Sequence, residues 1–383
     1  MRTSDERILT THVGSLPRPD DVIELLNRRA EGEAIDESEL ATAAEAARRE
    51  VIRRQDDVGI DVVNDGEQAR VGYNVYLRDR LDGFGDREVT RKLWSDVKEF
   101  PGFAERAYEG TELDPQDRPA AVGPIAYDPA RAERELASFG TLLEELDVDP
   151  VETFVTAASP GVATQTLRNR YYDTDEAYLE AMTEALRQEY ELVAASGSVL
   201  QIDATDMLGY RHRHYQDRSL DEFKDRVRRH VRAINEATRN VDAEQIRLHA
   251  CWGNYQGPHT HDVPLEEILP LLYDLDVGGL LLEQAQPRHQ QEFRAFAEHP
   301  LPDDWVVVPG VIDVKTNVVE HPETVADRIE RVADAVGDPT RVLAAPDCGF
   351  GTLVGWHTVE REIVWEKLAA MVEGAAIATD RLF

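Results

Sequence analysis

The sequence predicts an α/β protein folded as one (β/α)8 barrel, and three features of the chain lead to that expectation. Short runs rich in valine, isoleucine and leucine alternate with longer charged stretches of helical period. The alternation recurs eight times in 383 residues, which favours a closed barrel over an open doubly wound sheet. Polar clusters follow the apolar runs, at the strand ends where the active sites of such barrels lie.

The expected strands are apolar runs of strand length, bounded by polar or turn-forming residues. Their nearly continuous apolar character is typical of parallel strands covered on both faces. The eight candidates span residues 8–14, 61–66, 151–157, 198–203, 246–251, 278–283, 305–311 and 341–346.

Amphipathic stretches lie between the strands, and three of them span residues 39–59, 175–197 and 219–240. Each is long enough to cross back over a sheet, so the flanking strands are expected to be parallel. Residues 84–150 depart from this alternation and suggest a hairpin followed by a helix. Because no low-complexity or proline-rich linker divides the chain, we expect residues 1–383 to form one catalytic domain, with 84–150 as an insertion after the second strand.

The charge of the chain is strongly negative. It carries 75 acidic and 42 basic residues, a net charge of −33, and only five of the basic residues are lysines. Nucleic acids and anionic membranes would be repelled, so neither is expected as a partner. An acidic, lysine-poor surface favours a halophilic protein that works in concentrated salt, and an ordinary acidic enzyme is the alternative.

The chain is expected to be cytoplasmic. No apolar run approaches the length of a membrane span, and the first ten residues are charged where a signal peptide would be apolar. Two cysteines provide no disulfide framework, and a reducing compartment suits free thiolates.

Four residues at strand ends form one candidate zinc site. His249 and Cys251 are two positions apart and share a face of their strand, Glu283 ends the next strand, and Cys348 follows the last one in a PDCG turn. Imidazole, thiolate and carboxylate are the ligands that Zn²⁺ prefers. Isolated cysteines are more often small buried core residues, but the shared strand-end position of all four side chains favours a metal site here.

The expected ligands also indicate a type of chemistry. Two thiolates and a carboxylate place about three negative charges on Zn²⁺, which makes the metal a poor activator of water but leaves a bound substrate thiolate nucleophilic. This favours alkyl transfer to sulfur over hydrolysis.

The order of motifs along the whole chain resembles one family. The segments are TTHVGSLPRP, DGEQ, LQID, HACWGNYQGPH, LLLE, GVIDVKTNVVE and PDCG. They resemble the catalytic domain of the cobalamin-independent methionine synthases, and more closely the single-domain branch that also holds the epoxyalkane:coenzyme M transferases. The resemblance implies a barrel of the type shared with uroporphyrinogen decarboxylases, and a zinc-bound thiol, typically homocysteine, that attacks a methyl or alkyl donor.

The resemblance assigns roles to individual residues. His249, Cys251, Glu283 and Cys348 match the zinc ligands of the family. Ser15 matches a residue that binds the carboxylate of the amino acid, and Glu67 and Asp203 match the pair that holds its ammonium group. Helix capping is the alternative role for the last two.

Three further residues are candidate catalytic groups: His12, Asp313 and Lys315. The methionine synthases carry a histidine where this chain has Lys315, and that histidine is thought to assist protonation of the leaving pterin nitrogen. Lysine has an ordinary pKa of about 10.4, so either burial lowers the pKa of Lys315 or the donor is assisted differently.

Other departures from the family concern the donor side. The chain lacks the N-terminal half of the two-domain methionine synthases, and no tryptophan follows the third strand, where Tyr171 and Tyr172 could instead stack on a folate ring. His259, His261 and Asp262 could suggest a second metal, but supporting or loop roles are favoured because a proline begins the next helix. The RHRHYQDR segment suits contact with an anionic donor tail better than a metal site.

The sequence therefore predicts a zinc-dependent methyltransferase that makes methionine from homocysteine, with a methylated folate, a methanopterin or a corrinoid as donor, possibly protein-bound. Alkyl transfer to another thiol such as coenzyme M is the alternative within the same chemistry. A zinc-independent decarboxylase and a non-catalytic thiol- or methyl-carrier-binding protein are the alternatives of other classes.

Overall fold

The computed structural model describes residues 1–383 except 31, 89–93, 108–117 and 357. Its central sheet holds seven parallel strands in the order β1-β4-β6-β7-β8-β9-β10. Their bounds are β1 (Val62–Val63), β4 (Glu152–Ala158), β6 (Val199–Asp203), β7 (Ile246–Ala250), β8 (Gly279–Leu282), β9 (Val306–Ile312) and β10 (Ala345–Pro346).

The N-terminal segment closes the barrel between the two edge strands. Thr10 bridges Ala344 and Thr11 bridges Val62, both in parallel register. The N–H of Thr11 donates to the carbonyl of Ala344 at 2.8 Å, and the N–H of Val62 donates to the carbonyl of Thr10 at 3.0 Å. All eight predicted strand positions are therefore found in the predicted order, and the (β/α)8 fold class is confirmed.

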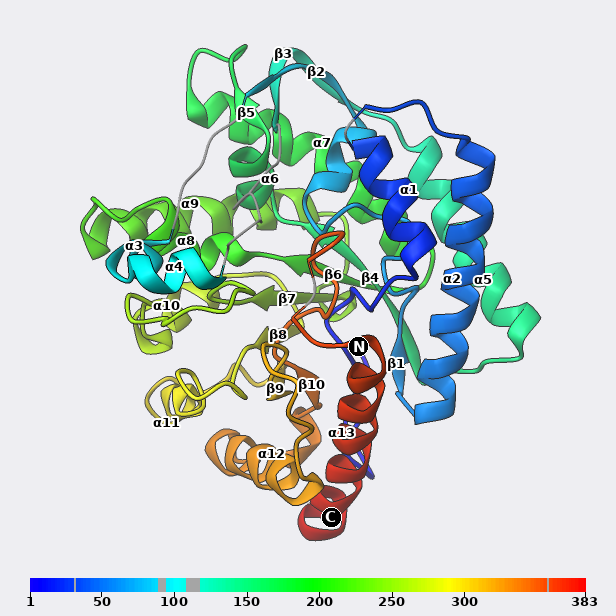
Figure 1. Ribbon diagram of the computed structural model, residues 1–383. Coiled ribbons are helices and arrows are strands. Elements are labelled where there is room, and N and C mark those ends of the chain that lie inside the picture. The colour runs from blue at the N-terminus through cyan, green and yellow to red at the C-terminus, as the bar shows by residue number, and fades with distance from the viewer. Residues whose placement is uncertain (31, 89–93, 108–117, 357) are drawn as a thin grey trace.

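Helices surround the sheet and cover its outer face (Figure 1). The long helices are α1 (Asp20–Ala30), α2 (Glu37–Val58), α7 (Asp175–Ala195), α9 (Leu220–Thr238), α12 (Pro322–Val336) and α13 (Arg361–Leu382), together with the shorter α10 (Leu265–Leu272). The local sequence sets several of their ends. Ser219 and Glu222 form a capping box at the start of α9, and Gly59 ends α2 in the left-handed conformation.

Shorter elements complete the connections. The short α-helices are α3 (Ser95–Glu99), α4 (Pro101–Ala107), α6 (Pro160–Thr166), α8 (Tyr210–Arg213) and α11 (Ala295–Glu298). The 3-10 turns are η1 (Val75–Asp79), η2 (Thr205–Met207), η3 (Ala243–Gln245), η4 (Glu292–Arg294) and η5 (Pro339–Arg341).

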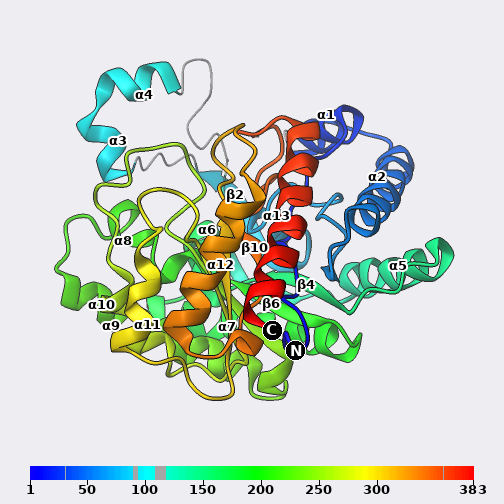
Figure 2. The same cartoon turned by 90° about the horizontal axis from the view of Figure 1, so that it is seen from below.

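The chain leaves the barrel between β1 and β4. There β2 (Leu81–Glu88) pairs antiparallel with β3 (Arg118–Tyr127), and α5 (Ala130–Leu146) follows β3. The short strand β5 (Arg168–Asn169), which comes after β4 in the chain, pairs in parallel with β3. This small sheet lies at the top of Figure 1, and α3 and α4 extend outward from the barrel in Figure 2. The division of the chain into one domain with an insertion stays a prediction.

The barrel interior holds a polar network as well as apolar side chains. Arg247 is buried and lies 4.1 Å from the ring centroid of Phe154. Its guanidinium donates to Gln201 Oε1 at 2.9 Å and to the carbonyl of His12 at 3.1 Å. These bonds satisfy a buried cation and link β7, β6 and the N-terminal segment beneath the strand ends.

Within the described parts of the chain, no helix combines the length and the apolar character that crossing a bilayer requires.

Candidate metal and substrate site

The strand ends bring three of the predicted metal ligands together. His249 lies on β7, Cys251 follows that strand, and Cys348 follows β10. An imidazole nitrogen and the two sulfur atoms all lie within 4.8 Å of one another, and the three residues are buried. The topology therefore unites ligands that are far apart in the sequence, as the strand-end pattern predicted.

Asp203 determines how His249 faces the site. The Nδ1 atom of His249 lies 2.9 Å from Asp203 Oδ1, which also accepts a hydrogen bond from Gln201 Nε2 at 2.9 Å. The Nε2 atom of His249 is buried and makes no well-aligned hydrogen bond among the described residues, although Cys348 lies close enough to interact with the ring. A carboxylate that accepts from Nδ1–H leaves the Nε2 lone pair available, which is the usual orientation of a metal-bound histidine.

The two cysteines form a strongly interacting pair. The pKa of Cys348 is lowered because the Cys251 thiol donates to its sulfur and because His249 lies beside it. The same contact, together with burial, raises the pKa of Cys251 well above its ordinary value. The pair alone therefore holds one thiolate, and a cation is needed to stabilise the second.

Glu283 follows β8, and its two carboxylate oxygens differ in their contacts. Its Oε1 pairs with the Lys315 ammonium, and His289 Nδ1 lies 3.6 Å from the same oxygen. Its Oε2 is buried without a hydrogen-bond partner in the described structure. Burial opposes ionisation, but Lys315 and His289 hold the pKa of Glu283 well below its ordinary range. Glu283 is therefore a charged carboxylate with one oxygen available to a metal.

Asp347 ties the Glu283 loop to the cysteine turn. Its Oδ1 accepts hydrogen bonds from the N–H groups of Gln284 and Ala285 at 2.8 and 2.7 Å, and its Oδ2 accepts one from Gln286 at 2.9 Å. A Cβ atom at Gly310 would lie 2.1 Å from Asp347 Oδ1, so glycine is required there. Although Asp347 adjoins Cys348 in the PDCG motif, the sequence analysis did not single it out.

Ser15 lies against the same cysteine turn. The N–H of Gly351 donates to Ser15 Oγ at 3.4 Å, and the N–H of Phe350 donates to the Ser15 carbonyl at 2.9 Å. A Cβ atom at Gly349 would lie 2.1 Å from Ser15 Oγ. This close approach requires glycine after Cys348 and places the hydroxyl beside the predicted metal ligands.

Glu67 is a buried carboxylate on a strained backbone. Its φ is 55°, in the left-handed region that non-glycine residues rarely adopt, and such strain often accompanies functional sites. Its Oε1 accepts from Thr156 Oγ1 at 2.8 Å, whereas its Oε2 is buried with no hydrogen-bond partner in the part of the chain described. Burial raises the pKa of Glu67 to about 7 against the pull of Arg70, and the charge of Asp203 adds to the rise. Among the described residues, no side chain donates a hydrogen bond to Glu67 Oε2, so this oxygen is available to a ligand.

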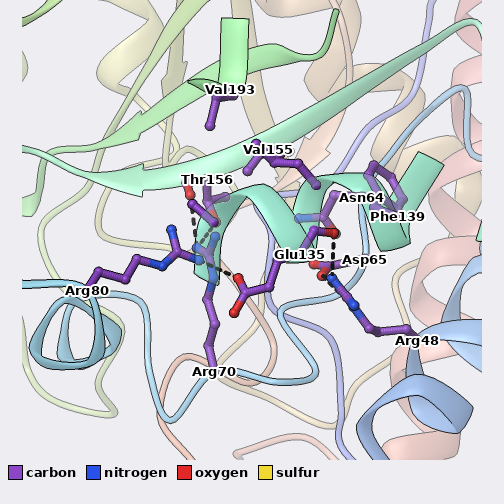
Figure 3. A pocket seen from close by; sticks show the side chains of 12 residues that line it. Arg48, Asn64, Asp65, Arg70, Arg80, Glu135, Phe139, Val155, Thr156 and Val193 are labelled. Atoms are coloured by element: carbon purple, nitrogen blue, oxygen red, sulfur yellow. Dashed lines mark hydrogen bonds and ion pairs between the residues drawn. The ribbon is translucent and has the colours of Figure 1, made fainter. Parts of the chain in front are cut away.

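Arg70 supports Glu67 indirectly, through Thr156. Arg70 donates to the carbonyl and to Oγ1 of Thr156, each at 2.9 Å, so that the Thr156 hydroxyl proton is directed to Glu67. Figure 3 shows Arg70 and Arg80 turned toward Thr156 and Glu135. Arg80 forms an ion pair with Glu135, so the buried guanidinium of Arg80 lies next to a carboxylate of opposite charge.

Lys315 and Asp313 follow β9. The N–H of Lys315 donates to Asp313 Oδ1 at 2.8 Å, and the Lys315 ammonium pairs with Glu283. Burial alone would lower the pKa of Lys315, but Glu283 and Asp347 raise it above its ordinary value. Lys315 is thus held as a cation against a predicted metal ligand.

His12 lies inside the barrel with both ring nitrogens engaged. Its Nε2 donates to Gln55 Oε1 at 2.8 Å, and its Nδ1 accepts from the N–H of Gly14 at 3.3 Å. Burial lowers the pKa of His12 to about 3, so the ring is neutral. These contacts join the N-terminal segment to α2.

The remaining candidates lie in other surroundings. Tyr171 is half exposed, and Tyr172 accepts a hydrogen bond from the N–H of Ile125 at 2.9 Å, in the segment that leads to α7. His261 is exposed and pairs with Glu99, whereas His259 and Asp262 are buried close to His289. The sequence carried no signal for His289, because its neighbours in space come from a different loop.

The family model for the cobalamin-independent synthase catalytic domain matches residues 8–96 and 119–377. The chain belongs to this family. The resemblance drawn from the motifs is therefore confirmed.

Relatives within the cobalamin-independent synthase family are of similar length. A methionine synthase of Thermococcus kodakarensis is 26% identical over 374 residues, which cover 97% of this chain and 94% of that one. A methionine synthase of Saccharolobus solfataricus is 25% identical over 376 residues, covering 97% and 95%.

Solved structures show the same fold. The B12-independent methionine synthase of Shewanella sp. W3-18-1, in complex with selenomethionine, matches with a TM-score of 0.72 and 20% identity over 98% of this chain and 99% of that one. A putative vitamin-B12-independent methionine synthase of Listeria monocytogenes matches with a TM-score of 0.65 and 20% identity over 96% and 98%.

Proposed function

We propose that the protein is a zinc-dependent methyltransferase that converts homocysteine to methionine. One observation carries the proposal: two buried atoms without hydrogen-bond partners in the described structure, His249 Nε2 and Glu283 Oε2, accompany two interacting cysteines at the same strand ends. An unsatisfied buried nitrogen and carboxylate oxygen are costly unless a cation completes them. The methionine synthases among the relatives support the same reading.

The proposed zinc ligands are His249, Cys251, Glu283 and Cys348, a donor set that suits Zn²⁺. When bound, zinc would supply a Lewis acid that favours the thiolate form of a substrate thiol. Asp203 holds the His249 ring by its Nδ1 atom, and Lys315 holds Glu283 by its Oε1 atom. We assign Lys315 a positioning role for Glu283, which Asp313 supports through the Lys315 N–H.

The amino acid part of the substrate would be bound by the first two strand ends and β6. Glu67 and Asp203 would present two carboxylates to one ammonium group, which would donate to the unpartnered Oε2 of Glu67. The Ser15 hydroxyl, whose oxygen accepts from the N–H of Gly351, would donate to the carboxylate of the amino acid. The Shewanella relative, whose structure holds selenomethionine, is consistent with a methionine-sized ligand in this fold.

In the proposed reaction, a sulfur–carbon bond forms as the bond between the methyl group and the donor breaks. The electron pair of the broken bond stays with the donor, the thiol gives up its proton, and the donor takes up a proton, so that overall the methyl group and the proton exchange places. The buried network beneath the site keeps the carboxylates fixed during this exchange, so little reorganisation is needed. A methylated folate, a methanopterin or a corrinoid, free or protein-bound, is the proposed class of donor.

Coenzyme M is the less favoured acceptor. It carries a sulfonate and no amine, so Glu67 and Asp203 would face no cation. A non-catalytic thiol- or methyl-carrier-binding protein would keep the pocket but show no turnover. We also propose that the protein acts in the cytoplasm of a halophile, because its net charge of −33 needs screening.

Methionine formation tests the proposal. The protein is incubated with homocysteine and either methyl-folate or methylcobalamin carrying an isotopically labelled methyl group, and labelled methionine is measured. We expect labelled methionine from wild type, and both the zinc content and the product to be lost in Cys251→Ser. Absence of product with both donors, combined with full zinc in Cys251→Ser, would refute the proposal, and coenzyme M as acceptor identifies the alternative.

A further inference from the structure

Three histidines surround one buried carboxylate beside the proposed zinc ligands. Asp262 Oδ2 lies 2.7 Å from His259 Nδ1 and 2.8 Å from His289 Nε2. Asp262 Oδ1 lies 2.9 Å from His212 Nε2. The four side chains are 2% exposed or less. A carboxylate buried this deeply requires a compensating cation.

The two ring nitrogens of His259 face different partners. Its Nε2 lies 3.1 Å from the carbonyl of Tyr255, which can only accept, so Nε2 carries a proton. In the neutral ring Nδ1 then has a lone pair, and this lone pair faces Asp262 Oδ2. A cation between the two groups would complete both of them.

His289 and His212 also lie against Asp262, but neither ring is well aligned with its oxygens. Their Nε2 atoms are within 2.9 Å of Asp262 oxygens, yet both are buried and make no hydrogen bond among the described residues. This geometry is expected when the lone pairs of the ring nitrogens point at an ion that the carboxylate also binds. Donor atoms of His259, Asp262 and His289 all lie within 4.8 Å of one another.

The surroundings hold these rings in place. Trp252 stacks on His289 with ring centroids 3.9 Å apart, and Gln286 Nε2 lies 2.6 Å from His289 Nδ1. Glu283 Oε1 lies 3.6 Å from the same nitrogen. An acceptor on the Nδ1 side, as Glu283 is, orients a histidine that binds metal through Nε2. His259 has a φ of 55°, and its N–H donates to the buried Asp96 at 2.7 Å, which fixes this strained position.

A pocket adjoins the cluster. Asp262 and His289 line a pocket of about 380 Å³, together with Glu292 and Arg288. The pocket gives an ion an entry path and room for water in its open coordination positions.

We propose that His259 Nδ1, His289 Nε2 and Asp262 form a second metal site, for a divalent transition-metal ion such as Zn²⁺, next to the first. Two imidazoles and a carboxylate suit this class of ion, whereas Mg²⁺ and Ca²⁺ prefer oxygen ligands alone. His212 faces the other oxygen of Asp262 and positions it. The ion would join the loop after β7 to the loop after β8 and place a positive charge beyond His289, whose Nδ1 lies 3.6 Å from Glu283.

The metal content of chelated and reconstituted protein tests this proposal without reference to activity. Because 75 acidic residues can hold metal adventitiously, the protein is loaded with Zn²⁺ and then dialysed in concentrated salt against a weak chelator. Wild type should retain two equivalents, and His259→Ala and Asp262→Asn should each retain one. His261→Ala, an exposed histidine of the same loop, is the matched control and should retain two.

Cobalt substitution separates the two sites. Cobalt bound by Cys251 and Cys348 shows a thiolate charge-transfer band, whereas a site of nitrogen and oxygen ligands shows only weaker visible bands. His259→Ala should keep the charge-transfer band and lose one equivalent, and Cys251→Ser/Cys348→Ser should do the reverse. A second equivalent that washes away, or that is unaffected in His259→Ala and Asp262→Asn, would be an adventitious ion only and would overturn the second site. Loss of the charge-transfer band from wild type would instead count against the first.

Discussion

Asp203 Oδ1 accepts a hydrogen bond from His249 Nδ1 at 2.9 Å, so the residue proposed to bind the substrate ammonium also orients a proposed metal ligand. The two roles fit together because Asp203 is held by Gln201 on the same strand and its charge raises the pKa of Glu67. The proposed metal site and the proposed ammonium site therefore share one carboxylate. Changes at Asp203 are expected to affect both.

Asp203→Asn tests this coupling. An asparagine amide can donate to His249 Nδ1 and so favour the tautomer whose Nε2 carries the proton. We expect zinc affinity to fall by roughly 10- to 100-fold, measured by competition with a chromogenic chelator, and KM for homocysteine to rise. Asp303→Asn, at an exposed position before β9, is the control. Unchanged zinc affinity in Asp203→Asn would show that Asp203 does not orient His249.

Glu67→Gln should stabilise the metal-free protein while it weakens substrate binding. The pKa of Glu67 is raised to about 7 in the folded chain from an ordinary 4.5, so between these values the folded state binds more protons than the unfolded state. Stability therefore falls as the pH rises from about 4.5 to 7, by on the order of 3 kcal/mol at most. Denaturant unfolding at pH 5 and pH 8 should show this loss reduced in the variant.

Substrate binding should also depend on the ionisation of Glu67, but it should become stronger as the pH rises, whereas stability falls. The ammonium needs ionised Glu67, so homocysteine binding to wild type should strengthen as the pH rises through about 7. Calorimetric titration at several pH values measures this. Glu67→Gln should bind at least tenfold more weakly at pH 8, because a neutral amide cannot neutralise a buried ammonium. Equal binding by the variant would place the ammonium elsewhere.

Asp347→Ala should destabilise the protein and detach Glu283 from the site. Three backbone N–H groups lose their acceptor, which costs roughly 2–5 kcal/mol in total. We expect a lower Tm together with reduced zinc retention. Gly310→Ala should show the same pattern, because its Cβ would displace Asp347. A lower Tm with full zinc retention would limit Asp347 to a structural role.

Salt should govern the stability of the whole chain. At a net charge of −33, self-repulsion is large once the Debye length exceeds about 10 Å, below 0.1 M salt. We expect Tm to fall and the protein to unfold on dilution from molar KCl into dilute buffer. Circular dichroism in a KCl series measures the transition, and a Tm independent of salt would rule out the halophilic interpretation.

The sequence was sufficient for features that depend on local pattern. The strand positions followed from apolar runs, and His249, Cys251 and Cys348 met in space because parallel strands place their carboxyl ends together. The closing strand was also predicted, although only Thr10 and Thr11 form bridges there.

Features that depend on which loops meet could not be predicted in the same way. Asp347 bonds to backbone groups after β8, and His289 reaches Asp262 from a separate loop. Neither contact produces a periodic pattern or a characteristic residue spacing that could be recognised in the sequence. The pKa of Lys315 is a further example. Burial lowers it, but Glu283 and Asp347 together raise it above the ordinary value, and these contacts across loops could not be read from the sequence.

The most direct measurement of the central claim is the thiolate charge-transfer band of the cobalt-substituted protein as homocysteine is added. The account predicts that the band strengthens and saturates at one equivalent, because the substrate thiolate joins Cys251 and Cys348 at the same ion. A band that is absent in the wild type, or that stays unchanged through saturation with homocysteine, would contradict it.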